Sequence, residues 1–123
     1  MTDKRKNLPF ARRLRFALAG LVHALTAERS VRIQATCLVA VMTVLVILRP
    51  APLWWALVIL ASACVLAAEL FNTAIEHLAD HLHPELHPAI RIVKDCAAAA
   101  VLLTVTGAIG VGIALAVELL ALH

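Results

Sequence analysis

The chain has no tyrosine, and charged residues make up only 15% of it, whereas 63% of its residues are hydrophobic. A soluble domain contains about 25% charged residues, so this composition is typical of an integral membrane protein. The three cysteines lie singly within apolar segments, without a CxxC motif, so a disulfide framework is not expected. Glycine-rich phosphate loops and the motifs of soluble kinases are also missing. We predict one membrane domain over residues 1–123.

Positive charge is concentrated near the N-terminus, since eight of the eleven lysines and arginines precede Ile33. A local basic block beside apolar segments is typical of a cytoplasmic flank that is attracted to anionic headgroups, so no nucleic-acid partner is predicted. Residues 1–8 are polar and are expected to be frayed. The apolar segment that follows is interrupted by His23, so no cleavable signal peptide is expected.

Hydrophobic periodicity and prolines predict an all-α membrane protein with an N-terminal amphipathic surface helix and three transmembrane helices. The surface helix, over 9–28, has apolar residues at three- and four-residue spacing and arginines largely off that stripe. Such a helix lies in the membrane interface, although the same stripe could pack on the bundle. The spans lie within three longer helices, over 31–48, 53–82 and 89–118.

The basic residues also predict the orientation of the spans. Eight precede the first span, one lies between the first and second, two lie between the second and third, and none follows. The positive-inside rule places the N-terminus and the segment 69–94 in the cytoplasm, with the C-terminus outside. Three spans make a thin bundle, so we expect an oligomer that buries its polar groups.

The second long helix carries an unusual row of polar side chains. At about 100° per residue, Glu69, Asn72, Glu76 and Asp80 project within about 80° of one another. A charged residue at membrane depth costs roughly 2.5–3.5 kcal/mol, so this row should face protein or water and meet a cation. The alternative is that these residues mark the solvated end of a span. This alternative would explain a single carboxylate, but it explains four polar groups on one face less well.

More charged groups are expected on the same membrane side, namely Glu28, Glu85, His87, Lys94 and Asp95. Carboxylates near a lysine suit Mg²⁺ and a nucleotide, because oxygen ligands hold the metal and the ammonium meets phosphate oxygens. His77 and His81, four residues apart, allow zinc as an alternative. No cysteine is close to them, however, and His77 projects away from the centre of the polar row.

The pattern Glu69-x-x-Asn72-Thr73-x-Ile75-Glu76-x-x-x-Asp80 resembles the signature of the prokaryotic diacylglycerol kinase family, small integral-membrane lipid kinases. The resemblance extends upstream to Glu28-Arg29-x-x-Arg32-Ile33 and downstream to Lys94-Asp95. It implies an ATP- and Mg²⁺-dependent lipid kinase of the bacterial inner membrane. It also implies a homotrimer in which neighbouring subunits build each active site.

Individual roles follow from the resemblance alone. Glu69 would be the general base for the lipid hydroxyl, while Glu28 and Glu76 would hold Mg²⁺. The residues implied to contact ATP are Asn72 and Lys94 at the phosphates, and Glu85, His87 and Asp95 nearer the nucleoside. Asp80 is assigned no chemical step. Phe16 stands where some members carry a tyrosine, so a hydroxyl contact to the nucleotide is expected to be missing.

The family phosphorylates diacylglycerol or undecaprenol, and the segments around Asn72–His77 and His87-Pro88 look more like the undecaprenol branch. The residues also allow a function of a different class. In that alternative the protein is a non-enzymatic oligomer whose carboxylates line an ion-conducting pore or bind a partner. A cation pore has no use for Lys94 beside the carboxylates. Protection of the protein by a nucleotide, seen only when Mg²⁺ is present, would therefore support the kinase over the pore.

Overall fold

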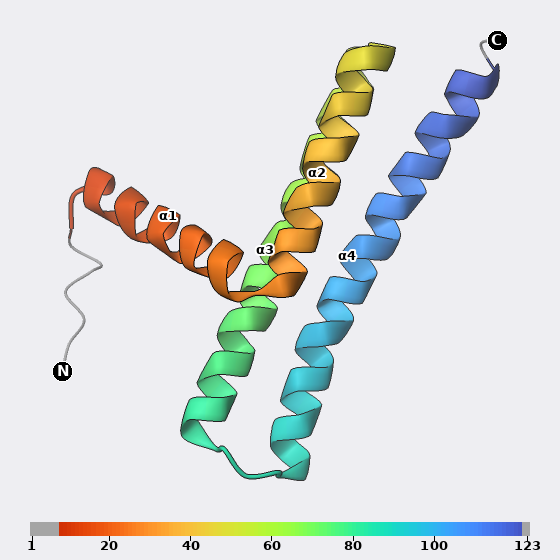
Figure 1. Cartoon of the computed structure of the whole chain (residues 1–123). Coiled ribbons are helices and arrows are strands. Elements are labelled where there is room, and N and C mark those ends of the chain that lie inside the picture. The colour runs from red at the N-terminus through yellow and green to blue at the C-terminus, as the bar shows by residue number, and fades with distance from the viewer. Residues whose placement is uncertain (1–7, 122–123) are drawn as a thin grey trace.

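A computed structural model describes residues 8–121 as four helices in the order α1 (Phe10–Ala27), α2 (Arg29–Leu48), α3 (Pro52–Leu82) and α4 (Pro88–Ala121) (Figure 1). The all-helical class is thus confirmed, and α2, α3 and α4 are each long and apolar enough to cross a membrane. Most of the segment predicted to be frayed lies outside the described residues.

The three long helices lie side by side, and α1 projects away from them (Figure 1). The 31 residues of α3 and the 34 of α4 correspond to about 47 and 51 Å, well over the roughly 30 Å hydrocarbon core. The 20 residues of α2 match that core, and α2 meets α1 part-way along α3 (Figure 1). Therefore α3 and α4 extend past the α1–α2 corner at the end where they are connected.

The turn between α2 and α3 is short because backbone conformation and proline end one helix and begin the next. Arg49 adopts the left-handed conformation (φ 47°, ψ 52°), and its N–H donates to the Leu45 carbonyl at 2.9 Å. Pro52 then occupies the first turn of α3, where its missing N–H leaves no bond unmade. The short turn makes α2 and α3 antiparallel neighbours.

The α1–α2 corner is fixed by backbone hydrogen bonds and by two buried side chains. The Glu28 N–H donates to the Ala24 carbonyl at 2.8 Å, and the Arg32 guanidinium donates to the Thr26 carbonyl at 2.8 Å. Ala24 and Val31, on either side of the corner, are buried. Glu28 is therefore held at a defined place beside α3.

At the opposite end of the bundle a small apolar core joins the three long helices. Its buried members are Leu45, Val58 and Leu115. Beside them the Trp54 indole N–H donates to Glu118 Oε1 at 2.9 Å, which links the start of α3 to the end of α4. This bond and the Asp80–Lys94 ion pair near the α3–α4 connection link the two antiparallel helices near both ends.

Replacing Trp54 with phenylalanine should lower the free energy of unfolding by about 1 kcal/mol, because the ring is largely kept and one hydrogen bond is lost. Unfolding in detergent micelles, followed by circular dichroism, measures the change. Trp55→Phe is the matched control, since no described residue accepts a hydrogen bond from its indole. Equal losses in both variants would show that ring volume, and not the bond to Glu118, matters.

Most apolar side chains of the long helices remain exposed in the single chain. Phe71, Leu103 and Leu120, for example, are exposed by 71%, 72% and 79%. Apolar surface of this extent is covered by lipid or by other subunits in a membrane protein. The exposed apolar surface of the single chain is therefore typical of a membrane protein.

Candidate functional site

The predicted polar row lies along α3, and its burial decreases toward the α3–α4 connection. Glu69 is only 6% exposed, and it is the one charged side chain that is buried among residues 8–121. Asn72 and Glu76 are half-buried, and Asp80 is exposed. The row therefore runs from a protected carboxylate to an open end over about 16 Å.

Asn72 and Glu76 form a hydrogen-bonded pair one helical turn apart. The Asn72 Nδ2 group donates to Glu76 Oε1 at 3.1 Å, which fixes the orientation of the carboxamide because a carboxylate only accepts. The Asn72 Oδ1 atom is then buried without a hydrogen-bond partner in the described part of the chain. Such an acceptor costs about 1–3 kcal/mol unless a donor or a cation meets it.

Glu28 reaches the same region from the α1–α2 corner. Its Oε1 atom lies 3.0 Å from Nε2 of His77, the residue that directly follows Glu76. The His77 ring also meets the His23 ring of α1 edge-on, with centroids 6.3 Å apart. The sequence predicts that His77 points away from the centre of the row. The sequence did not predict that Glu28 contacts α3 on the side where His77 projects.

A pocket of about 440 Å³ lies where α3 and α4 are connected. The four residues implied to contact the nucleoside or the phosphates from this side all line it, namely Glu85, His87, Lys94 and Asp95. His87 accepts a hydrogen bond from the Ala89 N–H at 3.1 Å through Nδ1, which orders the start of α4. The pocket also contains Arg91, to which the sequence assigned no role.

Asp80 connects this pocket to the polar row of α3. It lines the pocket, and its Oδ1 atom accepts a hydrogen bond from the Lys94 ammonium. The ion pair draws Lys94 of α4 toward the open end of the row. Asp80, which was assigned no step from the sequence, thus has a structural contact with a residue expected to bind phosphate.

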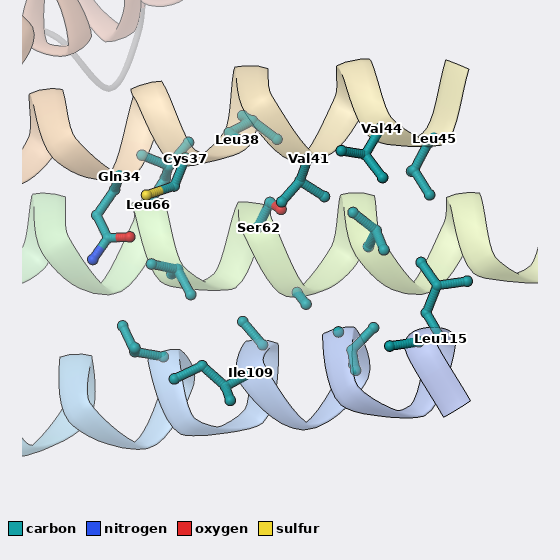
Figure 2. A pocket seen from close by; sticks show the side chains of 18 of the residues that line it. Gln34, Cys37, Leu38, Val41, Val44, Leu45, Ser62, Leu66, Ile109 and Leu115 are labelled. Atoms are coloured by element: carbon teal, nitrogen blue, oxygen red, sulfur yellow. The ribbon is translucent and has the colours of Figure 1, made fainter. Parts of the chain in front are cut away.

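An apolar groove of about 640 Å³ runs between α2, α3 and α4 on the other side of Glu69. Figure 2 shows Gln34 at one end of the groove and Leu45 with Leu115 at the other. Leu66 of α3 also lines the groove, near Gln34 (Figure 2). Glu69 follows Leu66 by three residues, so its backbone lies about one helical turn further along α3 than that of Leu66.

The polar row and the α1–α2 corner carry oxygen donors of the kind that bind Mg²⁺. Among residues 8–121, no three histidine, cysteine, aspartate or glutamate side chains come together as a metal cage, and His77 is engaged by Glu28. Mg²⁺ is commonly bound by one or two carboxylates, with water and phosphate oxygens completing its shell. Glu28, Glu76 and the unpartnered Oδ1 of Asn72 supply oxygen donors of that kind.

Comparisons with known proteins agree with the family resemblance of the polar row. The family model described as prokaryotic diacylglycerol kinase matches residues 15–116, a range that contains all the candidate site residues. A protein of Synechocystis sp. named diacylglycerol kinase is 38% identical over 99 residues. The aligned part covers 80% of this chain and 57% of that relative, so the chain spans little more than half of the relative's length.

Proposed function

Because the chain belongs to the prokaryotic diacylglycerol kinase family, we propose that it is an ATP- and Mg²⁺-dependent lipid kinase. It transfers the γ-phosphoryl group of ATP to the hydroxyl of a membrane lipid alcohol, either diacylglycerol or undecaprenol. The observation that carries the proposal is the buried carboxylate of Glu69. Glu69 is the first residue of the polar row that suits a metal-bound nucleotide, and it follows by one helical turn Leu66, which lines an apolar groove that suits a hydrocarbon chain.

Glu69 serves as the general base. A lipid chain in the groove brings its hydroxyl toward the Gln34 end, where the carboxylate of Glu69 would accept the proton as the lipid oxygen attacks the γ-phosphorus. The bond between the γ-phosphorus and the bridging oxygen then breaks, and ADP leaves. A positioned base contributes about 10²–10⁴-fold to such a step. Burial of Glu69 keeps competing water from its carboxylate, which favours the lipid alcohol over hydrolysis.

The nucleotide occupies the opposite side of Glu69, toward the α3–α4 connection. Lys94 meets the phosphates, and Glu85, His87 and Asp95 line the pocket for the nucleoside. Glu28, Glu76 and Asn72 supply the oxygen ligands. A Mg²⁺ ion held by these ligands would supply positive charge for the phosphates. Phosphoryl transfer needs little beyond this positioning and charge stabilisation.

The assembly and orientation complete the proposal. We expect a homotrimer in the bacterial inner membrane, with the N-terminus and the site in the cytoplasm, where ATP is present, and the C-terminus outside. The exposed apolar side chains of the long helices supply surface for contacts between subunits. A neighbouring subunit would also cover the open end of the polar row.

Transfer of labelled phosphate tests the function directly. Purified protein in mixed micelles with Mg²⁺ and labelled ATP is offered diacylglycerol and undecaprenol separately. We expect one of the two lipids to be labelled at a much higher rate, and that result names the substrate. No transfer to either lipid by a folded oligomer would reject the kinase, and cation flux into vesicles would then test the pore hypothesis.

A further inference from the structure

We propose that His77 is a positioning residue, which holds the carboxylate of Glu28 against the turn of α3 that carries Glu76, so that one carboxylate from the α1–α2 corner and one from α3 can share one divalent cation. The inference rests on the proposed function, since it concerns the same metal site. It assigns a role to a residue that the sequence offered only as a possible zinc ligand.

The hydrogen bond between His77 and Glu28 has a defined direction. An ionised carboxylate has no proton to donate, so Nε2 of His77 carries the hydrogen and donates to Glu28 Oε1 over 3.0 Å. The neutral imidazole with its proton on Nε2 and the imidazolium both provide this donor. The contact is therefore available in either protonation state.

Glu28 needs such a partner because its own helix does not orient its side chain. It precedes α2 with an extended backbone (φ −103°, ψ 123°), and its side chain makes no capping bond to that helix. A glutamate side chain left free at a helix corner samples many rotamers. Since His77 directly follows Glu76, its bond holds Glu28 against the same turn of α3 that carries Glu76.

Both carboxylates keep an oxygen atom for a cation. Glu28 bonds His77 through Oε1, and Glu76 bonds Asn72 through its own Oε1. The unpartnered Oδ1 of Asn72 is a third oxygen in the same stretch of α3. In metal sites, groups that orient the ligands in this way typically change metal affinity by 10–100-fold when they are removed.

The His77 ring is itself supported from α1. The His23 ring meets it at an interplanar angle of 81° with centroids 6.3 Å apart, an edge-to-face contact within the usual range for aromatic pairs. The imidazole of His77, on α3, is therefore contacted both by the surface helix and by the α1–α2 corner. The surface helix is thereby coupled to the position of Glu28.

Binding of Mn²⁺ measures the effect without any turnover. The titration, followed by electron paramagnetic resonance, uses the full-length protein in micelles with β,γ-imido-ATP as the nucleotide. His77→Met, which keeps the side-chain length and loses the donor, should weaken Mn²⁺ binding by about tenfold or more. His77→Gln, whose Nε2 amide can donate from about the place of the imidazole Nε2, should stay within about threefold of wild type. His81→Met, one turn further along α3, should leave binding unchanged.

A double-mutant cycle with Glu28→Gln distinguishes positioning from loss of stability. If His77 acts through Glu28, His77→Met should add little in the Glu28→Gln background, because coupled residues give non-additive effects. Additive losses would overturn the inference. So would unchanged or tighter Mn²⁺ binding by His77→Met, equal losses in the Met and Gln variants, or a wild type that binds no Mn²⁺. Should the wild type bind Mn²⁺ but label no lipid, the proposed kinase fails while the role of His77 stands.

Discussion

Glu69→Gln is expected to reduce the rate of lipid phosphorylation by about 10²–10⁴-fold, the contribution typical of a general base. Glutamine has nearly the same shape as glutamate but cannot take the proton from the lipid hydroxyl. The initial rate of phosphate transfer from labelled ATP, at saturating ATP and lipid, measures this loss. The KM for ATP should change little, because the pocket proposed for the nucleotide lies at the other end of the polar row.

Stability provides an independent check on this variant. Removing a buried charge takes away a desolvation cost, so Glu69→Gln should unfold at the same temperature as wild type or higher. Glu118→Gln is the matched control, since Glu118 lies at the opposite end of the bundle, where it accepts a hydrogen bond from Trp54. Its turnover should equal that of wild type. A rate for Glu69→Gln within tenfold of wild type would remove Glu69 as the base.

The direction of the polar row could be predicted from the sequence, but its depth could not. Helical periodicity alone places Glu69, Asn72, Glu76 and Asp80 on one face, because the angle per residue is fixed. The structure adds that Glu69 is buried while Asp80 is exposed. That gradient depends on where α3 packs against α4 and on where the two helices end, which no local pattern contains.

The contacts that complete the site were missed for a related reason. Glu28 and His77 are 49 residues apart, and Asp80 and Lys94 are 14 residues apart on separate helices. Whether such residues meet depends on the rotation of each helix and on the register between helices. The α1–α2 corner sets the first contact and the short α3–α4 connection sets the second. The sequence could place these residues on one side of the membrane, but not in pairs.

Replacing Lys94 with methionine is expected to lower kcat/KM for ATP by about 10²–10³-fold, the size of loss seen when one electrostatic stabiliser of a transition state is removed. Methionine keeps the unbranched apolar stem and removes the ammonium group. The loss should appear in steady-state kinetics with ATP varied at saturating lipid. The KM for the lipid should stay near its wild-type value, because the apolar groove contains no part of Lys94.

The Asp80–Lys94 ion pair predicts a smaller and different effect for Asp80→Asn. Asparagine still accepts a hydrogen bond from the ammonium but no longer attracts its charge, so the KM for ATP should rise several-fold while kcat is largely kept. In the Lys94→Met background the same change should have little further effect, since contacting residues couple. If Asp80→Asn instead lowered kcat as much as Lys94→Met does, Asp80 would touch the reacting groups itself. Its role would then extend beyond holding Lys94 at the open end of the row.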